Sequence, residues 1–262
     1  MNNNIIFIGD SFCASTDQAT WQQQQSRHQV YLPDGELGYP SLVAKHYDAQ
    51  LHCFGYSGKS WWYSYSKYQK AIAQKPTLWD NLIAIVFCHT DPYRINSSNE
   101  ELTTRHRPEF LERQQNEPDW LDRELGLASE YHVRYLHDHD FQSWAQQQYF
   151  KQLKEIYGQP LQIQGSMRTV KTLHFHSFVN TLWINNQLPG HSFTTPLNDI
   201  SRREFAGTDE EFHRYVSAND DRANHLNTHN NQALAQVIID SVDHYVEGES
   251  PINLSGFDQP CQ

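Results

Sequence analysis

Continuous apolar runs alternate with helical patterns along the N-terminal part of the chain. Residues 4–9 (Asn-Ile-Ile-Phe-Ile-Gly), 51–54 (Leu-His-Cys-Phe) and 82–88 are predominantly apolar, which is typical of parallel strands buried on both faces. Between them, residues 39–47 and 61–73 carry apolar side chains three and four positions apart, and the first of these stretches has a proline near its start. This order of strand, helix and strand predicts right-handed crossover units.

The second half of the chain continues the pattern less regularly. Residues 141–157 have helical periodicity, and residues 172–178 alternate apolar and polar side chains as a strand does. Residues 228–246 predict an amphipathic helix, with one face formed by Leu234, Val237, Ile238, Val242 and Tyr245. The pattern predicts one α/β domain over residues 1–262, built as a three-layer, doubly wound, mostly parallel sheet.

Two stretches interrupt this repeating unit. Residues 20–38 hold four consecutive glutamines and a Pro-Asp-Gly turn signal, and they separate the first strand from its helix. Residues 91–140 are rich in charges and also contain Trp120, Tyr131 and Tyr135. Insertions that follow strand ends commonly build lids, so we expect both stretches to wall the substrate site.

Composition narrows the class of partner. Acidic residues outnumber Lys and Arg by 31 to 20, for a formal charge of -11, so a general nucleic-acid surface is not expected. No apolar stretch approaches the roughly 20 residues of a membrane span, and the first residues do not resemble a signal peptide. We therefore expect a cytoplasmic protein with neither nucleic-acid nor membrane partners. The sequence does not reveal the oligomeric state.

Four cysteines, at positions 13, 53, 88 and 261, form no Cys-x-x-Cys pair. They are interpreted as buried or chemically idle thiols, because a chain of this length needs no disulfides to hold a core. Cys13 lies two residues beyond Ser11 and could line the same cleft. It is not taken as the nucleophile.

A serine follows the first strand directly. The triplet Gly9-Asp10-Ser11 places a hydroxyl beyond the carboxyl end of a parallel strand, where open α/β sheets bind ligands. Serine at a helix start is also a common cap, so a second observation is needed. It comes from His225, which immediately precedes the last helix and follows Asp220 and Asp221. A serine hydroxyl requires a base such as imidazole to become nucleophilic.

At four places, in order, the chain resembles the SGNH/GDSL hydrolases. The first is Gly9-Asp10-Ser11, and the second is the stretch 54–60 (Phe-Gly-Tyr-Ser-Gly-Lys-Ser), whose Gly58 matches the glycine of the second block. The third is 87–91 (Phe-Cys-His-Thr-Asp), in place of the usual Gly-x-Asn-Asp. The fourth is His225 with an acid before it. The resemblance implies the flavodoxin-like fold of that family.

The resemblance also implies the roles of the site residues. Ser11 would be the nucleophile, His225 the base, and Asp221 the orienting acid, with Asp220 as the alternative because Arg222 occupies the usual position of the acid. A backbone carbonyl could also replace the acid. The oxyanion hole would comprise Ser11, Gly58 and Thr90.

The third donor departs from the family pattern. Thr90 stands where the family has asparagine, and His89 is the other candidate donor in this block. Losing an oxyanion donor can lower the rate on the order of 100-fold or more. Neither a metal nor a cofactor is implied by the resemblance.

The function expected from these residues is hydrolysis of an acyl ester or an O-acylated carbohydrate through an acyl-enzyme. Two alternatives remain. One is a catalytically impaired binding or assembly protein, indicated by the missing asparagine and the displaced acid. The other is an O-acyltransferase that uses the same residues.

Two further patterns, one of histidines and one of tryptophans, suggest binding sites but have simpler structural explanations. His174 and His176 share one strand face, and residues 137–140 read His-Asp-His-Asp, but spacing identifies no third metal ligand. Trp61 and Trp62 could floor a sugar-binding cleft, although core packing of one helix face is the default. Adjacent tryptophans on a helix cannot both face the same core.

Overall fold

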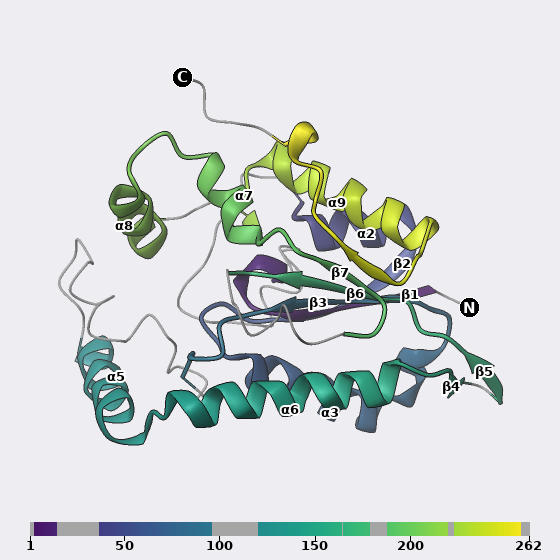
Figure 1. Ribbon diagram of the computed structural model, residues 1–262, viewed down its shortest axis with the longest axis horizontal. Helices are drawn as coiled ribbons and strands as arrows, with labels where there is room; N and C mark the ends of the chain where they lie inside the picture. The colour runs from purple at the N-terminus through teal and green to yellow at the C-terminus, as the bar shows by residue number, and fades with distance from the viewer. Residues whose placement is uncertain are drawn as a thin grey trace.

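Six parallel strands form the centre of the fold (Figure 1). The computed structural model describes residues 3–14, 37–95, 120–163, 165–178, 188–219 and 223–257. Across the sheet the strands are β2 (Ala49–Gly55), β1 (Asn3–Gly9), β3 (Leu82–His89), β6 (Thr172–His176), β7 (His191–Phe193) and β8 (Gly248–Ser250). The order reverses at β1, so the carboxyl ends of β1 and β3 meet at the switch point of a doubly wound sheet.

The helices cover both faces of this sheet and complete three layers (Figure 1). On one face, α2 (Tyr39–His46), α7 (Leu197–Arg203) and α9 (Thr228–Asp243) share a hydrophobic core with Ile5 and Phe7 of β1. On the other, α3 (Trp61–Gln74) and α6 (His139–Tyr157) pack against Ile6 and Ile8. Successive side chains of a strand point to opposite faces, so the uninterrupted apolar run of β1 serves both cores at once.

Shorter elements surround these layers. They are η1 (Ser11–Cys13), η2 (Pro76–Trp79), α5 (Trp120–Tyr131), the π-helical η4 (His132–Leu136), the antiparallel hairpin β4 (Leu161–Ile163) and β5 (Ser166–Arg168), α8 (Asp209–Asn219), η5 (Ala223–His225) and η6 (Leu254–Gly256).

The α/β class, the parallel sheet and the predicted strands and helices are confirmed, with ends that differ by a few residues. On α9, Leu234, Ile238 and Val242 are buried, and Val237 and Tyr245 pack partly against the same core. Residues 20–36 of the first predicted insertion and 96–119 of the second lie outside the described residues. Within 91–140, the described part includes α5 and η4, where Tyr131 and Tyr135 are exposed.

Strand β6 differs from its sequence pattern. Its alternation suggested one polar face, but all five residues are buried. The polar face is a stack of imidazoles: His174 bonds His89 of β3 (Nδ1 to Nε2, 2.9 Å), and the two rings lie nearly parallel. His176 stacks on His89 with 5.8 Å between ring centroids. Burial is the main cause of the lowered pKa of all three imidazoles, so they are neutral in the folded protein.

Acid is expected to destabilise the fold through these imidazoles. Burial lowers the pKa of His174 and His176 to about 3, below the ordinary 6.5 that they regain on unfolding. The unfolded chain therefore binds protons first as the pH falls below 6.5, and stability is lost progressively toward pH 3. Each imidazole accounts for about 2 kcal/mol of that loss at pH 5.

Urea unfolding at pH 8, 6.5 and 5 measures this dependence. His174→Phe should reduce the loss of stability between pH 8 and pH 5, whatever its stability at pH 8. His46→Gln, which replaces an exposed imidazole on α2, should leave the pH dependence unchanged. An identical pH dependence in wild type and His174→Phe would contradict the explanation.

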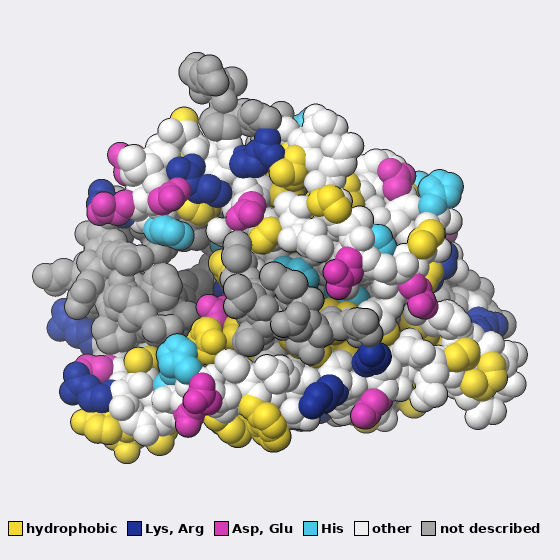
Figure 2. All heavy atoms as spheres, viewed as in Figure 1, with side chains coloured by type: hydrophobic (Ala, Val, Ile, Leu, Met, Phe, Trp, Pro, Cys, Tyr) yellow, Lys and Arg dark blue, Asp and Glu magenta, His cyan; other side chains and the backbone are white. Residues whose placement is uncertain are grey.

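The surface carries charges of both signs. Figure 2 shows lysine and arginine side chains interspersed with acidic ones on the face that it displays. Several large apolar side chains of α5, η4 and α6 are exposed, among them Leu127, Leu136, Phe141 and Trp144. Within the described ranges, the structure has no helix that combines the length and apolar character needed to cross a membrane.

Candidate active site

The nucleophile candidate lies on a tight turn after β1, which pairs with β2 on one side and β3 on the other. Gly9, the last residue of β1, pairs with Gly55 of β2 and Cys88 of β3. A Cβ on Gly9 would lie 2.3 Å from the Cys88 carbonyl oxygen, so the close approach of β3 requires glycine. Asp10 then caps η1, because its carboxylate accepts the N–H of Phe12 (3.0 Å). This turn sets Ser11 at the carboxyl edge of the sheet.

Ser11 and His225 meet at this edge, as the sequence predicted. The distance between Ser11 Oγ and His225 Nε2 is 2.7 Å, although the residues are 214 positions apart. Ser11 is 8% exposed and His225 is half-buried. The Phe12 ring lies against the imidazole, with 4.8 Å between centroids. A hydroxyl in hydrogen-bond contact with an imidazole has the geometry needed for proton transfer during nucleophilic attack.

The turn that presents His225 has an unusual backbone. Asn224 and His225 both have positive φ, at 53° and 59°. Two consecutive left-handed residues other than glycine cost free energy and persist only where surrounding contacts enforce them. Here the Asn224 amide donates to the carbonyl oxygens of Ala14 (2.7 Å) and Ser11 (3.3 Å). Asn224, which sequence reasoning missed, thus joins the histidine turn directly to the serine turn.

A buried carboxylate lies immediately before the serine. Asp10 is fully buried, and its Oδ1 accepts the hydroxyl of Ser177, after β6, at 2.9 Å. Its Oδ2 lies 3.4 Å from a guanidinium nitrogen of Arg94. Arg94 and Ser177 were not predicted as site residues, because Arg94 lies in a stretch assigned to an insertion and Ser177 is a single serine within the predicted strand 172–178. The structure brings both to the nucleophile turn.

The loop after β2 carries the predicted second donor. Tyr56 donates its N–H to the Gly9 carbonyl oxygen (3.2 Å), so the loop starts beside the nucleophile turn. It closes through the Lys59 N–H to the Tyr56 carbonyl oxygen (3.3 Å), and Gly58 lies within this turn with φ of 68°. A left-handed residue at this point of a turn favours glycine. Ser11, Gly58 and Thr90 therefore follow three neighbouring strands.

Thr90 is buried at the end of β3. The Gln146 amide of α6 donates to its carbonyl oxygen at 3.1 Å. Its hydroxyl oxygen is also buried, and no hydrogen-bond partner for it occurs among the described residues. A buried hydroxyl without a partner is costly unless a ligand satisfies it. His89, the alternative donor, points into the stacked imidazoles and bonds His174.

The predicted orienting acids, Asp221 and Asp220, lie outside the described residues. A different carboxylate holds the other side of the histidine turn. Glu204, at the end of α7, accepts the N–H of Asn227 on both oxygens (3.1 and 2.9 Å) and the side-chain amide of Asn230 at 2.6 Å. Glu204 thus anchors the start of α9, two residues after His225. No local sequence signal connects it with this turn.

Among the described residues, Cys13, Cys53 and Cys88 form no disulfide, and Cys261 lies outside the described residues. Burial raises the pKa of the Cys13 thiol well above its usual value, and the neighbouring Cys88 raises it further. The thiolate is the nucleophilic form of cysteine, so a buried, protonated Cys13 does not compete with Ser11. Cys88 contacts the Tyr39 hydroxyl at 3.1 Å.

The adjacent residues Trp61 and Trp62 point to different sides of α3, as helical geometry requires. Trp61 is buried and stacks on Tyr149 of α6, with ring centroids 4.8 Å apart, and Tyr65 is buried in the same layer. Trp62 is 53% exposed. Core packing therefore explains Trp61 and Tyr65.

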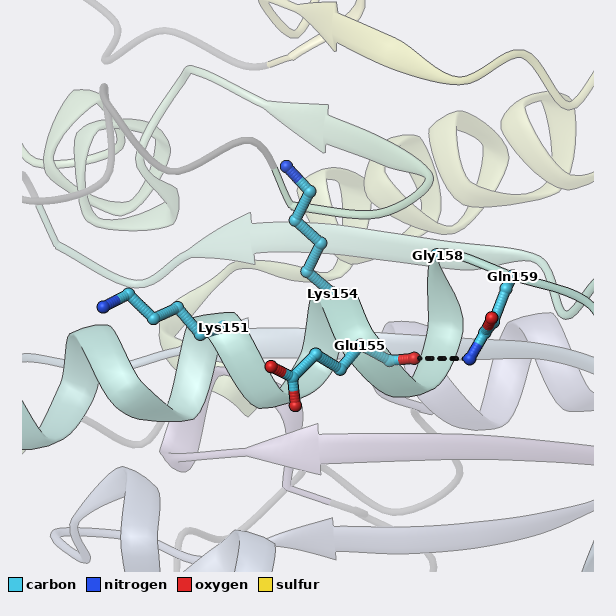
Figure 3. A pocket seen from close by; sticks show the side chains of 5 residues that line it. All are labelled: Lys151, Lys154, Glu155, Gly158 and Gln159. Atoms are coloured by element: carbon cyan, nitrogen blue, oxygen red, sulfur yellow. Dashed lines mark hydrogen bonds between the residues drawn. The ribbon is translucent and has the colours of Figure 1, made fainter.

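One surface hollow lies apart from the predicted residues. Its lining, drawn in Figure 3, comes from the C-terminal part of α6 and the residues just after it: Lys151, Lys154, Glu155, Gly158 and Gln159. All five are exposed, and none belongs to the Ser11 and His225 region. The hollow lacks the buried polar groups typical of a catalytic site.

Comparison of the chain with protein-family models, with curated proteins and with solved structures found no match. Within the described part of the chain, no group of three or more His, Cys, Asp or Glu side chains is arranged to hold a metal ion. The interpretation of the site therefore depends on its own geometry.

Proposed function

We propose that this protein is a serine hydrolase of the SGNH/GDSL kind that cleaves a small-molecule or carbohydrate ester. The observation that carries the proposal is the 2.7 Å contact between Ser11 Oγ and His225 Nε2. The position of Ser11 after the central strand of a doubly wound sheet also supports it. The flavodoxin-like SGNH fold is part of the same proposal.

The reaction proceeds in two halves. Ser11 Oγ attacks the ester carbonyl carbon while its proton passes to His225 Nε2, and the carbonyl oxygen becomes a tetrahedral oxyanion. His225 then protonates the leaving alcohol, and the acyl group stays on Ser11. In the second half, water gives a proton to His225 and attacks the acyl carbon, which releases the acid and restores the Ser11 hydroxyl.

The oxyanion is stabilised by donors from three strand ends. The proposed donors are the backbone N–H groups of Ser11 and Gly58 and the Thr90 hydroxyl, whose oxygen has no other partner among the described residues. A hydroxyl is shorter than the amide of asparagine and rotates freely, so we expect a weaker hole than one completed by asparagine. Asp221, or alternatively Asp220, remains the proposed orienting acid.

A fluorophosphonate probe tests the proposal directly, because it labels serines activated by a base. We expect the folded protein to be labelled at Ser11, identified by peptide mapping, and to hydrolyse short-chain p-nitrophenyl esters. Ser11→Ala should lose both properties. Ser129→Ala, which removes a buried hydroxyl from α5, should retain both.

Equal hydrolysis by wild type and Ser11→Ala would end the hydrolase proposal. Labelling of Ser11 without ester hydrolysis would instead identify an activated serine that uses another acyl acceptor or substrate. Product analysis with added sugar alcohols would then separate transfer from hydrolysis.

A further inference from the structure

Arg94 occupies a central position between the loops of the proposed site. It lies on the loop after β3, four residues beyond Thr90, and only 11% of its side-chain surface is exposed. The loop itself is fixed to α6, since the Tyr93 hydroxyl contacts Ser143 Oγ at 3.2 Å and the Gln146 amide bonds the Thr90 carbonyl oxygen. The arginine therefore projects from an anchored segment.

Its guanidinium contacts three other segments at once. Nη2 lies 3.4 Å from Asp10 Oδ2, and Nη1 donates to the Lys59 carbonyl oxygen at 3.2 Å. The guanidinium carbon lies 5.2 Å from the centre of the Phe178 ring, in a cation–π contact. One planar group is thus held by a carboxylate, a carbonyl oxygen and an aromatic face.

The three residues that the Arg94 guanidinium contacts each lie next to, or pack toward, a residue of the proposed mechanism. Asp10 directly precedes Ser11, and Lys59 directly follows Gly58. Phe178 packs edge-on against Phe12 (5.7 Å), which in turn contacts the imidazole of His225. Arg94 therefore connects the turn that carries the nucleophile to the loop that carries the second oxyanion donor.

The chemistry of this position suits arginine specifically. A guanidinium presents donors in several fixed directions and stacks on aromatic rings, whereas lysine offers a single compact charge. Oxyanion donors accelerate a reaction only when they are held in place before the charge develops. The two loops are already joined at their base by the hydrogen bond from the Tyr56 N–H to the Gly9 carbonyl oxygen, and Arg94 adds a second connection directly beside Gly58.

We propose that Arg94 is a positioning residue that fixes the spacing between the N–H groups of Ser11 and Gly58, so that both point to one oxyanion. The inference rests on the proposed hydrolase function. Misplacement of reacting groups by about 1 Å can lower the rate on the order of 100-fold, so the loss of Arg94 should appear in kcat. Substrate binding before attack does not use the oxyanion geometry, so KM should change little.

The test compares wild type, Arg94→Lys and Ser11→Ala in kcat, KM and urea midpoint, with a p-nitrophenyl ester as substrate. Arg94→Lys keeps a positive charge near Asp10 and should fold, but its kcat should fall by about 10- to 100-fold with KM within about threefold. Arg202→Met is the matched control. Like Arg94, Arg202 pairs with a carboxylate (Asp209), donates to backbone carbonyl oxygens and faces an aromatic ring (Phe212), but it does so around the connection between α7 and α8.

A second pair of variants guards against unfolding of Arg94→Lys. The double variant Asp10→Asn/Arg94→Gln removes both charges of the pair and so leaves no buried unpaired charge. Its kcat should be about 10- to 100-fold lower than that of the single variant Asp10→Asn. Ser11-dependent hydrolysis with unchanged kcat in both comparisons would overturn this inference alone. The inference would also be overturned if Arg94→Lys raised KM at constant kcat, or if Arg202→Met lowered kcat as much as Arg94→Lys does. Absence of Ser11-dependent hydrolysis in wild type would overturn the proposed function, and this inference with it.

Discussion

His225→Asn is expected to lower kcat for ester hydrolysis by on the order of 10⁴- to 10⁶-fold while the protein stays folded. Asparagine can bond the Ser11 hydroxyl, but it cannot take up its proton, so the nucleophile stays protonated. The substitution suits the backbone, because asparagine tolerates the φ of 59° at this position. The half-buried position of the imidazole further limits the cost to folding.

Steady-state kinetics of three variants make this prediction specific. Ser11→Ala combined with His225→Asn should lose no more activity than either change alone, because the two residues act as a unit. His229→Asn, one turn along at the start of α9, should keep wild-type kcat. A loss of less than tenfold in His225→Asn would show that the 2.7 Å contact serves structure and not catalysis.

Gly9→Ala should destabilise the fold by about 3 kcal/mol or more, or abolish folding. The added methyl group would meet the backbone oxygen and Cβ of Cys88 and the sulfur of Cys13, at 2.3, 2.7 and 2.8 Å. The first is main chain of the adjacent central strand and cannot rotate away, so β1 and β3 must separate. Because Ser11 follows two residues later, any surviving folded protein should also lose activity.

Urea unfolding compared with Gly256→Ala measures this effect. Gly256 lies in η6, where a methyl group would meet nothing within 4 Å, so its change should stay within about 0.5 kcal/mol. Equal midpoints for the two alanine variants would contradict the close approach of β1 and β3.

The central layers of the fold were predictable because burial on both faces leaves a clear sequence pattern. Strands β1 and β3 are uninterrupted apolar runs, and α9 carries its apolar residues on one face. Strands β7 and β8, of three residues each, were missed, since His-Ser-Phe and Gly-Glu-Ser are too short and polar to show a period. Their place is determined by pairing at the edge of an existing sheet.

The imidazoles of β6 show the limit of pattern reading in another way. Alternation correctly predicted that His174 and His176 share a face, but it did not indicate what covers that face. Both are buried and stack on His89, which itself lies against Tyr149 and Phe150 of α6. A neutral imidazole can act as an aromatic core residue, and its sequence letter alone does not reveal its protonation state.

The contact between Ser11 and His225 was predictable, but the residues that support it were not. Ser11 and His225 follow recognisable local patterns, a strand ending in glycine and a histidine before the last helix. Arg94, Asn224 and Glu204 act through contacts between segments that are far apart in the sequence, and single polar residues in loops carry no periodic signal.

The long separation between serine and histidine has a consequence for biosynthesis. Translation produces Ser11 before His225, with 213 residues between them, and the turn with positive φ contacts the serine turn itself. In the proposed enzyme, a nascent chain would expose a hydroxyl that no base can yet activate. The proposed nucleophile would gain its base only after residue 225 has been synthesised and has folded against it.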